Sequence, residues 1–293
     1  SICWRHRMSS DRLCLFHLSD IHFGLEDRDA LAWVRDEIAA KRPAAVVITG
    51  DHTMRARHHE FAAATRWITA LDVPVTISIG NHDMPYFNLI ERFFDPYKRF
   101  QGMKTLVERE IDLPGLAIVP LKTVRRWQPR MNWSKGWVTA PALADCLDAL
   151  DRLPAGTRAL VAVHHPLREA GTHGTALTRG GENALRELAR RKVLGVLSGH
   201  VHDAFDIAEP TSEGTVRMIG AGTLSERTRS TPPSFNELTW DGVRLEVAVR
   251  NLEGVPTPDM LIADVPEDAT PPRTPGEPVA PVDRVPPVDP PVH

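Results

Sequence analysis

The chain has 293 residues, 42% of them hydrophobic, which allows a sizeable core in one large domain or two small ones. Its formal net charge of -3 provides no general basic surface, so we expect no extended nucleic-acid binding. No apolar stretch reaches the length that a membrane span requires, and we expect no span.

The cysteines and the N-terminus bear on the compartment. Cys3, Cys14 and Cys146 are odd in number and scattered, which favours free thiols in a reducing environment. The first residues lack the apolar core of a signal peptide. We therefore expect a cytoplasmic protein, with residues 1–10 as an N-terminal extension and Met8 as a candidate natural start.

The first part of the chain alternates strands and helices. Apolar runs predict strands at Leu13–Leu18, Ala45–Thr49 and Val75–Ile79, and amphipathic spacing predicts helices over Asp29–Arg42 and His58–Leu71. Such βαβ units place successive strands in parallel.

The middle of the chain is less regular. A further helix is predicted over Tyr86–Phe100, followed by short strands at Leu106–Ile111 and Leu116–Leu121. Residues 122–140 then carry several Arg and Trp in one long connection. Such a stretch is either functional or disordered in a compact domain, and its tryptophans argue against disorder. We leave open whether it forms a rim over a site or packs as a plain loop.

Regular patterning resumes after residue 140. Helices are predicted over Pro141–Leu153 and Glu182–Lys192, with strands at Ala159–Val163 and Val193–Ser198. Between them, the Gly-rich stretch from Arg168 to Gly181 is a candidate lid.

The last folded segment reads as β-structure. Strands at Val216–Ile219, Phe235–Trp240 and Val243–Arg250, the last two joined at an Asp-Gly turn, are expected to complete a second sheet. Proline then recurs and apolar periodicity ends, so residues 256–293 are predicted to be a disordered tail. The folded, catalytic domain is thus predicted to span residues 11–255.

Polar residues follow five of the apolar runs. Taken alone, Gly80–Asp83 could be an ordinary turn without a function, because Asn and Asp side chains bond to their own backbone in turns. Five such ends in one chain favour a functional site, since open α/β sheets place their chemistry at the carboxyl ends of strands. The groups gathered in this way are Asp20, His22, Asp51, Asn81, His82, His164, His200 and His202.

Their chemistry points to metal. Ligands on alternate residues, as in Asp20-x-His22, face one way on an extended chain. Imidazole with carboxylate suits Mn, Fe, Zn or Co, and the lack of thiolates excludes a structural tetrathiolate zinc site. Eight groups exceed the needs of one ion, so we expect two divalent ions about 3.5–4 Å apart. Their surplus charge would be neutralised by a bridging hydroxide and a phosphodiester anion.

These motifs resemble the calcineurin-like metallophosphoesterase superfamily. They are Asp20-x-His22, Gly50-Asp51, Gly80-Asn81-His82-Asp83, His164-His165-Pro166 and Gly199-His200-x-His202. Within it the chain is most similar to the bacterial class III cyclic-nucleotide phosphodiesterase and glycerophosphodiesterase branch. The resemblance covers residues 11–250 and implies an α/β fold, an αββα sandwich of two packed mixed sheets flanked by helices, with all ligands at one edge.

The resemblance also implies a ligand set. One ion is expected on Asp20, His22, Asp51 and His202, and the other on Asp51, Asn81, His164 and His200. Asp51 would bridge the two ions. Of the histidine pair, His164 is the expected ligand, and His165 is expected to pack or to support the ligands.

Two further residues are expected to be catalytic. By the same resemblance, His82 would stabilise the transition state and protonate the leaving oxygen, with Asp83 orienting its ring. His52 departs from the family, which usually has an apolar residue after Gly-Asp. It would either point to solvent or change metal affinity or substrate reach.

The expected function is metal-dependent hydrolysis of a small phosphodiester, a cyclic nucleotide or a glycerophosphodiester, by attack of a metal-bridging hydroxide. A phosphomonoesterase or nuclease of the same superfamily is the nearest alternative. A non-catalytic protein-binding module is the third. The motifs leave substrate identity to residues 122–140 and 168–181, and leave a homo-oligomer open.

Overall fold

The computed structural model describes residues 12–85, 94–125, 135–172, 178–227 and 231–252. All of them lie in the first of two compact units of the chain, residues 1–262. The predicted extension at 1–10, the predicted tail at 256–293 and most of the helix predicted over Tyr86–Phe100 fall outside the described residues. No helix among the described residues is both long and apolar enough to cross a bilayer.

The first sheet has five strands in the order β10-β9-β1-β2-β3. Strands β1, β2 and β3 run parallel to one another, as the βαβ pattern predicts. Strand β9 is antiparallel to both of its neighbours, β1 and β10. The strands are β1 (Leu13–Leu18), β2 (Ala45–Ile48), β3 (Val75–Ile77), β9 (Ser234–Trp240) and β10 (Leu245–Asn251).

The second sheet has the order β4-β5-β6-β8-β7. All its neighbours are parallel except the edge pair β7 and β8. The strands are β4 (Leu116–Pro120), β5 (Arg158–Ala162), β6 (Gly195–Ser198), β7 (Phe205–Thr211) and β8 (Gly214–Gly220).

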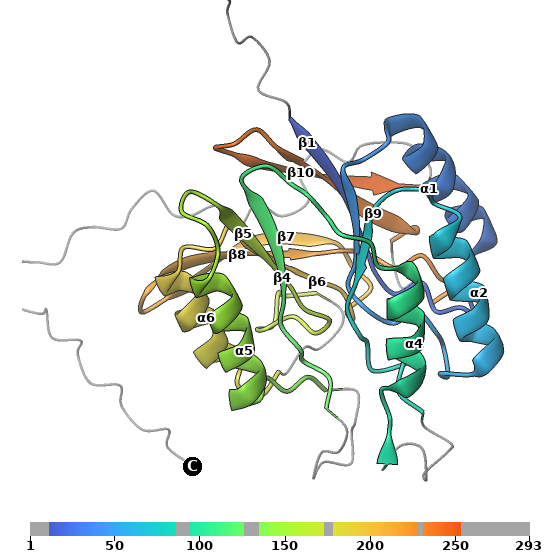
Figure 1. The fold of residues 1–293 in the computed structure, drawn as a ribbon, viewed down its shortest axis with the longest axis horizontal. Helices are drawn as coiled ribbons and strands as arrows, with labels where there is room; N and C mark the ends of the chain where they lie inside the picture. Colours follow the sequence, from blue (N-terminus) through green and yellow to red (C-terminus); the bar gives the residue numbers. More distant parts are fainter. Residues whose placement is uncertain (1–11, 86–93, 126–134, 173–177, 228–230, 253–293) are drawn as a thin grey trace, which may run out of the picture. The chain divides into compact units, whose positions relative to one another are not determined.

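Helices cover the outer face of each sheet (Figure 1). They are α1 (Arg28–Lys41), α2 (His58–Thr69) and α4 (Lys98–Val107) on the first sheet, and α5 (Ala140–Asp151) and α6 (Gly181–Arg190) on the second. The first of these helices shows why such segments form. The Asp27 side chain accepts from the backbone N of Ala30 at the start of α1, and Leu31, Val34 and Ile38 form its buried face.

A third apolar cluster lies between the two sheets. It joins Leu15, Val47 and Leu238 of the first sheet to Leu160 and Leu197 of the second. The sheets therefore pack face to face with helices outside them, which confirms the predicted fold of two mixed sheets flanked by helices.

Three details of the predicted topology were wrong. The strand expected at Leu106–Ile111 is not formed, because α4 continues to Val107 and buries Phe100, Met103 and Val107 along one helical face. The last strands do not share one sheet, since β8 joins the second sheet and β9 and β10 join the first. Strand β7 was missed because its Asp, Glu and Pro residues suit an edge strand rather than a buried one.

Candidate metal centre

The site forms where loops after β1, β2, β3, β5 and β6 meet. The first two loops stay joined beyond their strands, with the backbone N of His22 donating to the carbonyl of Asp51 at 2.9 Å. The two sheets are joined there as well: Nδ1 of His164 lies 2.8 Å from the Thr49 carbonyl, and the backbone N of His200 donates to Asp20 Oδ2 at 2.8 Å. All five strand ends therefore deliver their polar residues to one place.

The backbone at these residues is unusual. Left-handed φ angles occur at Asp20 (53°), His22 (52°), Asp51 (51°), His200 (70°) and His202 (66°). Residues with a Cβ rarely adopt this conformation, and such strain gathers at functional sites. The expectation that Asp20-x-His22 converges along an extended chain was therefore wrong, because these ligands converge through tight turns.

Two glycines allow the loops to approach. A Cβ on Gly80 would lie 2.1 Å from Asp51 Oδ1, and a Cβ on Gly199 would lie 2.4 Å from Asp20 Oδ2. Only a residue without a side chain fits at these positions. The Gly in Gly80-Asn81 and Gly199-His200 is thus required by the close approach of the neighbouring loop.

One group of donors consists of Asp20, His22 and His202, all of which are buried. Asp20 Oδ1 lies 3.2 Å from His202 Nε2 and 3.6 Å from His22 Nε2, and the two Nε2 atoms are 3.4 Å apart. Ligands about 2.0–2.1 Å from one divalent ion lie roughly 3.0–3.4 Å from one another. The separations match three ligands of a single ion.

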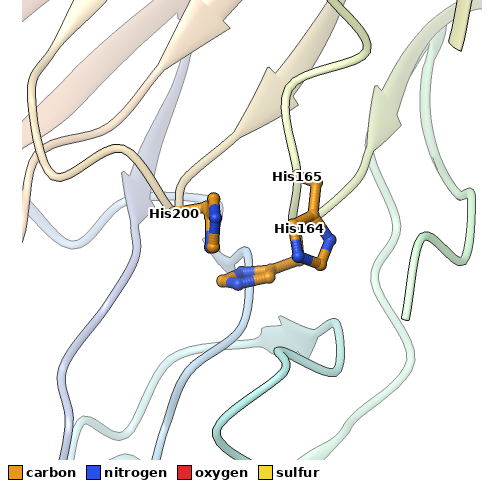
Figure 2. Close-up of side chains that lie close together, drawn as sticks. All are labelled: His164, His165 and His200. Carbon is orange, nitrogen blue, oxygen red and sulfur yellow. The ribbon is translucent and has the colours of Figure 1, made fainter. Parts of the chain in front are cut away.

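A second group lies beside the first. The side chains of His164, His165 and His200 lie together, the first two from the segment after β5 and the third from the loop after β6 (Figure 2). Asn81 Oδ1 is 2.9 Å from His164 Nε2. Asp51 lies between the two groups, with Oδ2 3.7 Å from His22 Nε2 and Oδ1 3.5 Å from His164 Nε2.

Hydrogen bonds behind the rings set their tautomers. His202 Nδ1 is 3.0 Å from the carbonyl of Arg227, and His164 Nδ1 is bonded to the Thr49 carbonyl. A carbonyl only accepts, so each Nδ1 carries a hydrogen, and in the neutral form of each ring the lone pair of Nε2 is directed into the site. For His164 this lone pair meets the Asn81 Oδ1 acceptor, a contact that a cation between them would make favourable.

Asp20 points to the same conclusion. Its Oδ1 atom is buried and has no hydrogen-bond partner in the described structure. A buried carboxylate oxygen without a donor is costly unless a cation or proton compensates it. The residues present therefore fit a pair of divalent ions shared through Asp51.

Metal binding needs deprotonated groups, and the pKa shifts of His22, His200 and Asp20 suit it, whereas that of His202 runs the other way. Burial lowers the pKa of His22, and burial with the neighbouring His164 lowers that of His200 to about 3. Burial opposes the charge of Asp20, but His202 outweighs it and holds the Asp20 pKa well below its usual value. Burial likewise opposes the charge of His202, and Asp20 outweighs it to raise the His202 pKa.

His82 stands at the edge of the site. Its Nδ1 atom is 2.8 Å from the Met54 carbonyl, so Nε2 faces the metal ligands, and its ring meets that of His22 edge to face at 4.9 Å. The backbone N of His82 donates to Asp51 Oδ1 at 2.8 Å. This places the Nε2 nitrogen of His82 next to the ligand side chains His22 and Asp51.

Asp83 does not make the contact that was expected of it. The carbonyl of Met54, rather than Asp83, holds the His82 ring. The Asp83 carboxylate is buried and accepts from the backbone N of Gly80 and from the N and Oγ1 of Thr53, and it pairs with His52 Nδ1 at 2.9 Å. His52 is fully buried, so the alternative that it points to solvent was also wrong.

A model of the calcineurin-like phosphoesterase family matches residues 15–204 of the chain, which include every residue of the site. The chain belongs to the calcineurin-like phosphoesterase family. The family assignment made from the motifs is thereby confirmed. No curated protein gives a significant match to this family member.

Solved structures with the same fold have little sequence identity to this chain. A dimetal phosphatase from Danio rerio is 16% identical, with a TM-score of 0.56 over 80% of this chain and 98% of its own. A purple acid phosphatase from yellow lupin (Lupinus luteus) seeds is 13% identical, with a TM-score of 0.63 over 85% of this chain and 53% of its own. GAP50, the anchor in the inner membrane complex of Plasmodium, is 12% identical, with a TM-score of 0.56 over 84% of this chain and 87% of its own. At these identities the likeness concerns the fold alone.

Two loops of the chain meet beside His165. The backbone N of Trp137 donates to the Thr123 carbonyl, and the guanidinium groups of Arg125 and Arg179 lie over the Trp137 ring, 4.1 and 4.2 Å from its centroid. His165 bonds to Thr123 Oγ1 through Nδ1 at 2.9 Å. The described ends of residues 122–140 and 168–181 thus pack next to the site, while residues 126–134 and 173–177, and with them the lid prediction, lie outside the described chain.

Sequence reasoning missed several residues that support this site. Thr53 and Thr123 carry no motif of their own, and Met54 acts through its carbonyl, which any residue would provide. Only the position of Thr53, two residues after Asp51, was a signal that could have been used.

Proposed function

We propose that this chain is a dinuclear metal-dependent phosphoesterase that hydrolyses a small phosphodiester of the cyclic-nucleotide or glycerophosphodiester type. The observation that supports it is the convergence of imidazole, carboxylate and amide donors from five strand ends around Asp51. Structures with this fold include a dimetal phosphatase and a purple acid phosphatase.

The ligand roles follow the two groups. Asp20, His22 and His202 would hold one ion, and Asn81, His164 and His200 the other, with Asp51 shared because its two oxygens face opposite groups. When bound, a pair of divalent ions supplies Lewis-acid polarisation of the phosphoryl oxygens and lowers the pKa of a water toward about 7. Mn, Fe, Zn and Co all suit these donors.

We assign the protonation of the leaving group to His82. Its Nε2 atom faces the ligands, and the Met54 carbonyl fixes the ring from behind. In the proposed reaction Nε2 takes up a proton from water and then gives it to the leaving oxygen of the ester. His82 is also near enough to His22 and Asp51 to be a ligand, and we assign it the catalytic role because each ion already has four donors.

The test is a metal and turnover assay on the purified protein. We expect about two equivalents of transition metal, a rise in Tm on adding Mn²⁺, and Mn²⁺-dependent cleavage of bis-p-nitrophenyl phosphate. Asp51→Asn should lower metal content and activity, whereas Asp36→Asn, which changes an exposed carboxylate on α1, should leave both unchanged. A protein that binds no transition metal, or is inert toward this diester with Mn²⁺ present, would contradict the proposal.

A phosphomonoesterase is the second candidate, and the cation of Arg227 beside His82 favours it, because a monoester carries more negative charge than a diester. Parallel turnover of p-nitrophenyl phosphate, a cyclic nucleotide and DNA would separate monoesterase, diesterase and nuclease activity. A cytoplasmic location stays a prediction.

The fold alone does not secure catalysis, since a protein with this fold is described as an anchor. A non-catalytic module would not depend on Asn81 or His82. We expect Asn81→Ala and His82→Ala to abolish turnover while circular dichroism shows a retained fold. Activity that survives in both variants would remove these residues from the mechanism.

A further inference from the structure

The segment after β8 contacts the metal-ligand residues at Thr223 and at Arg227. Thr223 Oγ1 donates to the Asp20 carbonyl at 2.7 Å and lies 2.7 Å from Ser225 Oγ, which accepts from the backbone N of Arg227 at 3.3 Å. The carbonyl of Arg227 accepts from His202 Nδ1. The backbone of Arg227 is therefore held against one of the ligand residues.

The side chain of Arg227 reaches across to the other side of the site. Its Nη1 atom is 3.2 Å from His82 Nε2 and 3.9 Å from Met54 Sδ. Since Nη1 is a donor, it donates to the Nε2 lone pair. The guanidinium thus faces the one side-chain atom of His82 that is directed into the site.

This guanidinium has no carboxylate partner among the described residues, whereas Arg168, Arg190, Arg191, Arg217 and Arg250 each form ion pairs. Within the same part of the chain, its Nε and Nη2 atoms form no hydrogen bond, and the side chain is partly buried. A partly buried cation with unused donors in a fork geometry is suited to an oxyanion with two free oxygens.

We infer that Arg227 is a substrate-binding residue whose guanidinium contacts the free oxygens of the phosphoryl group undergoing hydrolysis. The inference rests on the proposed function and adds a residue to it. His82 Nε2 would meet the leaving oxygen of the ester, so a guanidinium 3.2 Å from Nε2 meets the same phosphoryl group. On binding, the guanidinium exchanges its contact with Nε2 for contacts with phosphoryl oxygens, which leaves Nε2 to the leaving oxygen.

The charge of the ester determines how much Arg227 contributes to binding it. A diester carries one negative charge near neutral pH and offers two free oxygens, whereas a monoester approaches two charges and offers three. Coulomb attraction rises with the charge of the anion. Arg227 therefore stabilises a bound monoester, or inorganic phosphate, more than a diester.

The test compares wild type, Arg227→Ala, Arg227→Lys and the exposed control Arg35→Ala, all loaded with Mn²⁺. Truncating the side chain at residue 227 leaves its backbone carbonyl on His202, so metal content should stay that of wild type. Titration calorimetry with inorganic phosphate should show binding about 10- to 100-fold weaker in Arg227→Ala, the range for one charge-assisted contact. Arg227→Lys should fall between the two, and Arg35→Ala should match wild type.

Kinetics provide the second readout. Arg227→Ala should lose more kcat/KM toward p-nitrophenyl phosphate than toward bis-p-nitrophenyl phosphate. Phosphate affinity within about twofold of wild type in Arg227→Ala would overturn the inference, and so would a loss of metal, because the residue would then act through His202. A wild-type protein that cleaves no ester would refute the proposed function, while the phosphate titration would still decide the role of Arg227.

Discussion

Replacing Asp83 by Ala should be among the most destabilising changes near the site. The carboxylate is fully buried and satisfies the backbone N atoms of Gly80 and Thr53, the Thr53 hydroxyl and the His52 ring. Each buried donor left without an acceptor costs about 1–3 kcal/mol, and breaking a buried pair costs about 3–5 kcal/mol. These terms overlap, so we expect a loss of about 3–5 kcal/mol from a total of about 5–15 kcal/mol.

The measurement is urea unfolding followed by circular dichroism, with the midpoint Tm as a check. For a domain of this size the loss corresponds to a fall in Tm of about 6–20 °C. Asp83→Asn retains one acceptor and should fall between wild type and Asp83→Ala. Asp241→Ala is the matched control, because that carboxylate also accepts two backbone N–H groups, from Val243 and Arg244, but in a surface turn. If Asp83→Ala destabilised no more than Asp241→Ala, the reasoning from buried donors would be refuted.

Three further results are expected. Gly80→Ala should reduce metal affinity about 10- to 100-fold, because the added methyl group would press on Asp51. The control Gly102→Ala in α4, whose Cβ would have nothing within 4 Å, should bind metal as wild type does. Equal metal affinity in the two variants would contradict the close approach. Burial opposes the charge of Asp83, but the neighbouring His52 outweighs it and lowers the Asp83 pKa to about 2. Wild type should therefore lose stability as the pH falls from about 4 to 2 in acid titrations, and Asp83→Asn should lose less in that range. Burial raises the pKa of Cys146 to about 12, so its thiol should resist iodoacetamide at pH about 8 until the protein unfolds, as peptide mass spectrometry would show.

Much of the fold follows from local patterns in the chain. The apolar runs at Leu13–Leu18 and Ala45–Ile48 are strands because buried parallel strands are apolar on both faces. The polar residues after them converge because carboxyl ends of parallel strands share an edge. Contacts between distant segments could not be predicted. The local sequence does not indicate that Ser234–Trp240 pairs with β1 rather than with β8, since either pairing would bury its apolar face.

The second layer of the site could not be predicted for the same reason. Arg227 lies 145 residues from His82 along the chain, and the contact depends on the path of the whole segment after β8. The His52–Asp83 pair joins two loops whose separation is set by the pairing of β2 with β3. Motifs select residue types that bind metal or move protons, whereas the residues that hold them are fixed by tertiary packing and carry ordinary side chains.

The strain of the site has a physical explanation in this arrangement. Five ligand residues adopt left-handed backbone, at a cost of order 1–3 kcal/mol each, and Asp20 Oδ1 is buried without a donor. Relaxing any of these turns would move a ligand away from its group and break a bond that fixes a neighbour, such as the contact between His200 N and Asp20. The two packed sheets are stable enough to hold turns that would otherwise relax, because the apolar core between them joins the strands on which the ligands are mounted. Strain of this size therefore argues that the donor set is maintained for what it binds and not for the stability of the fold.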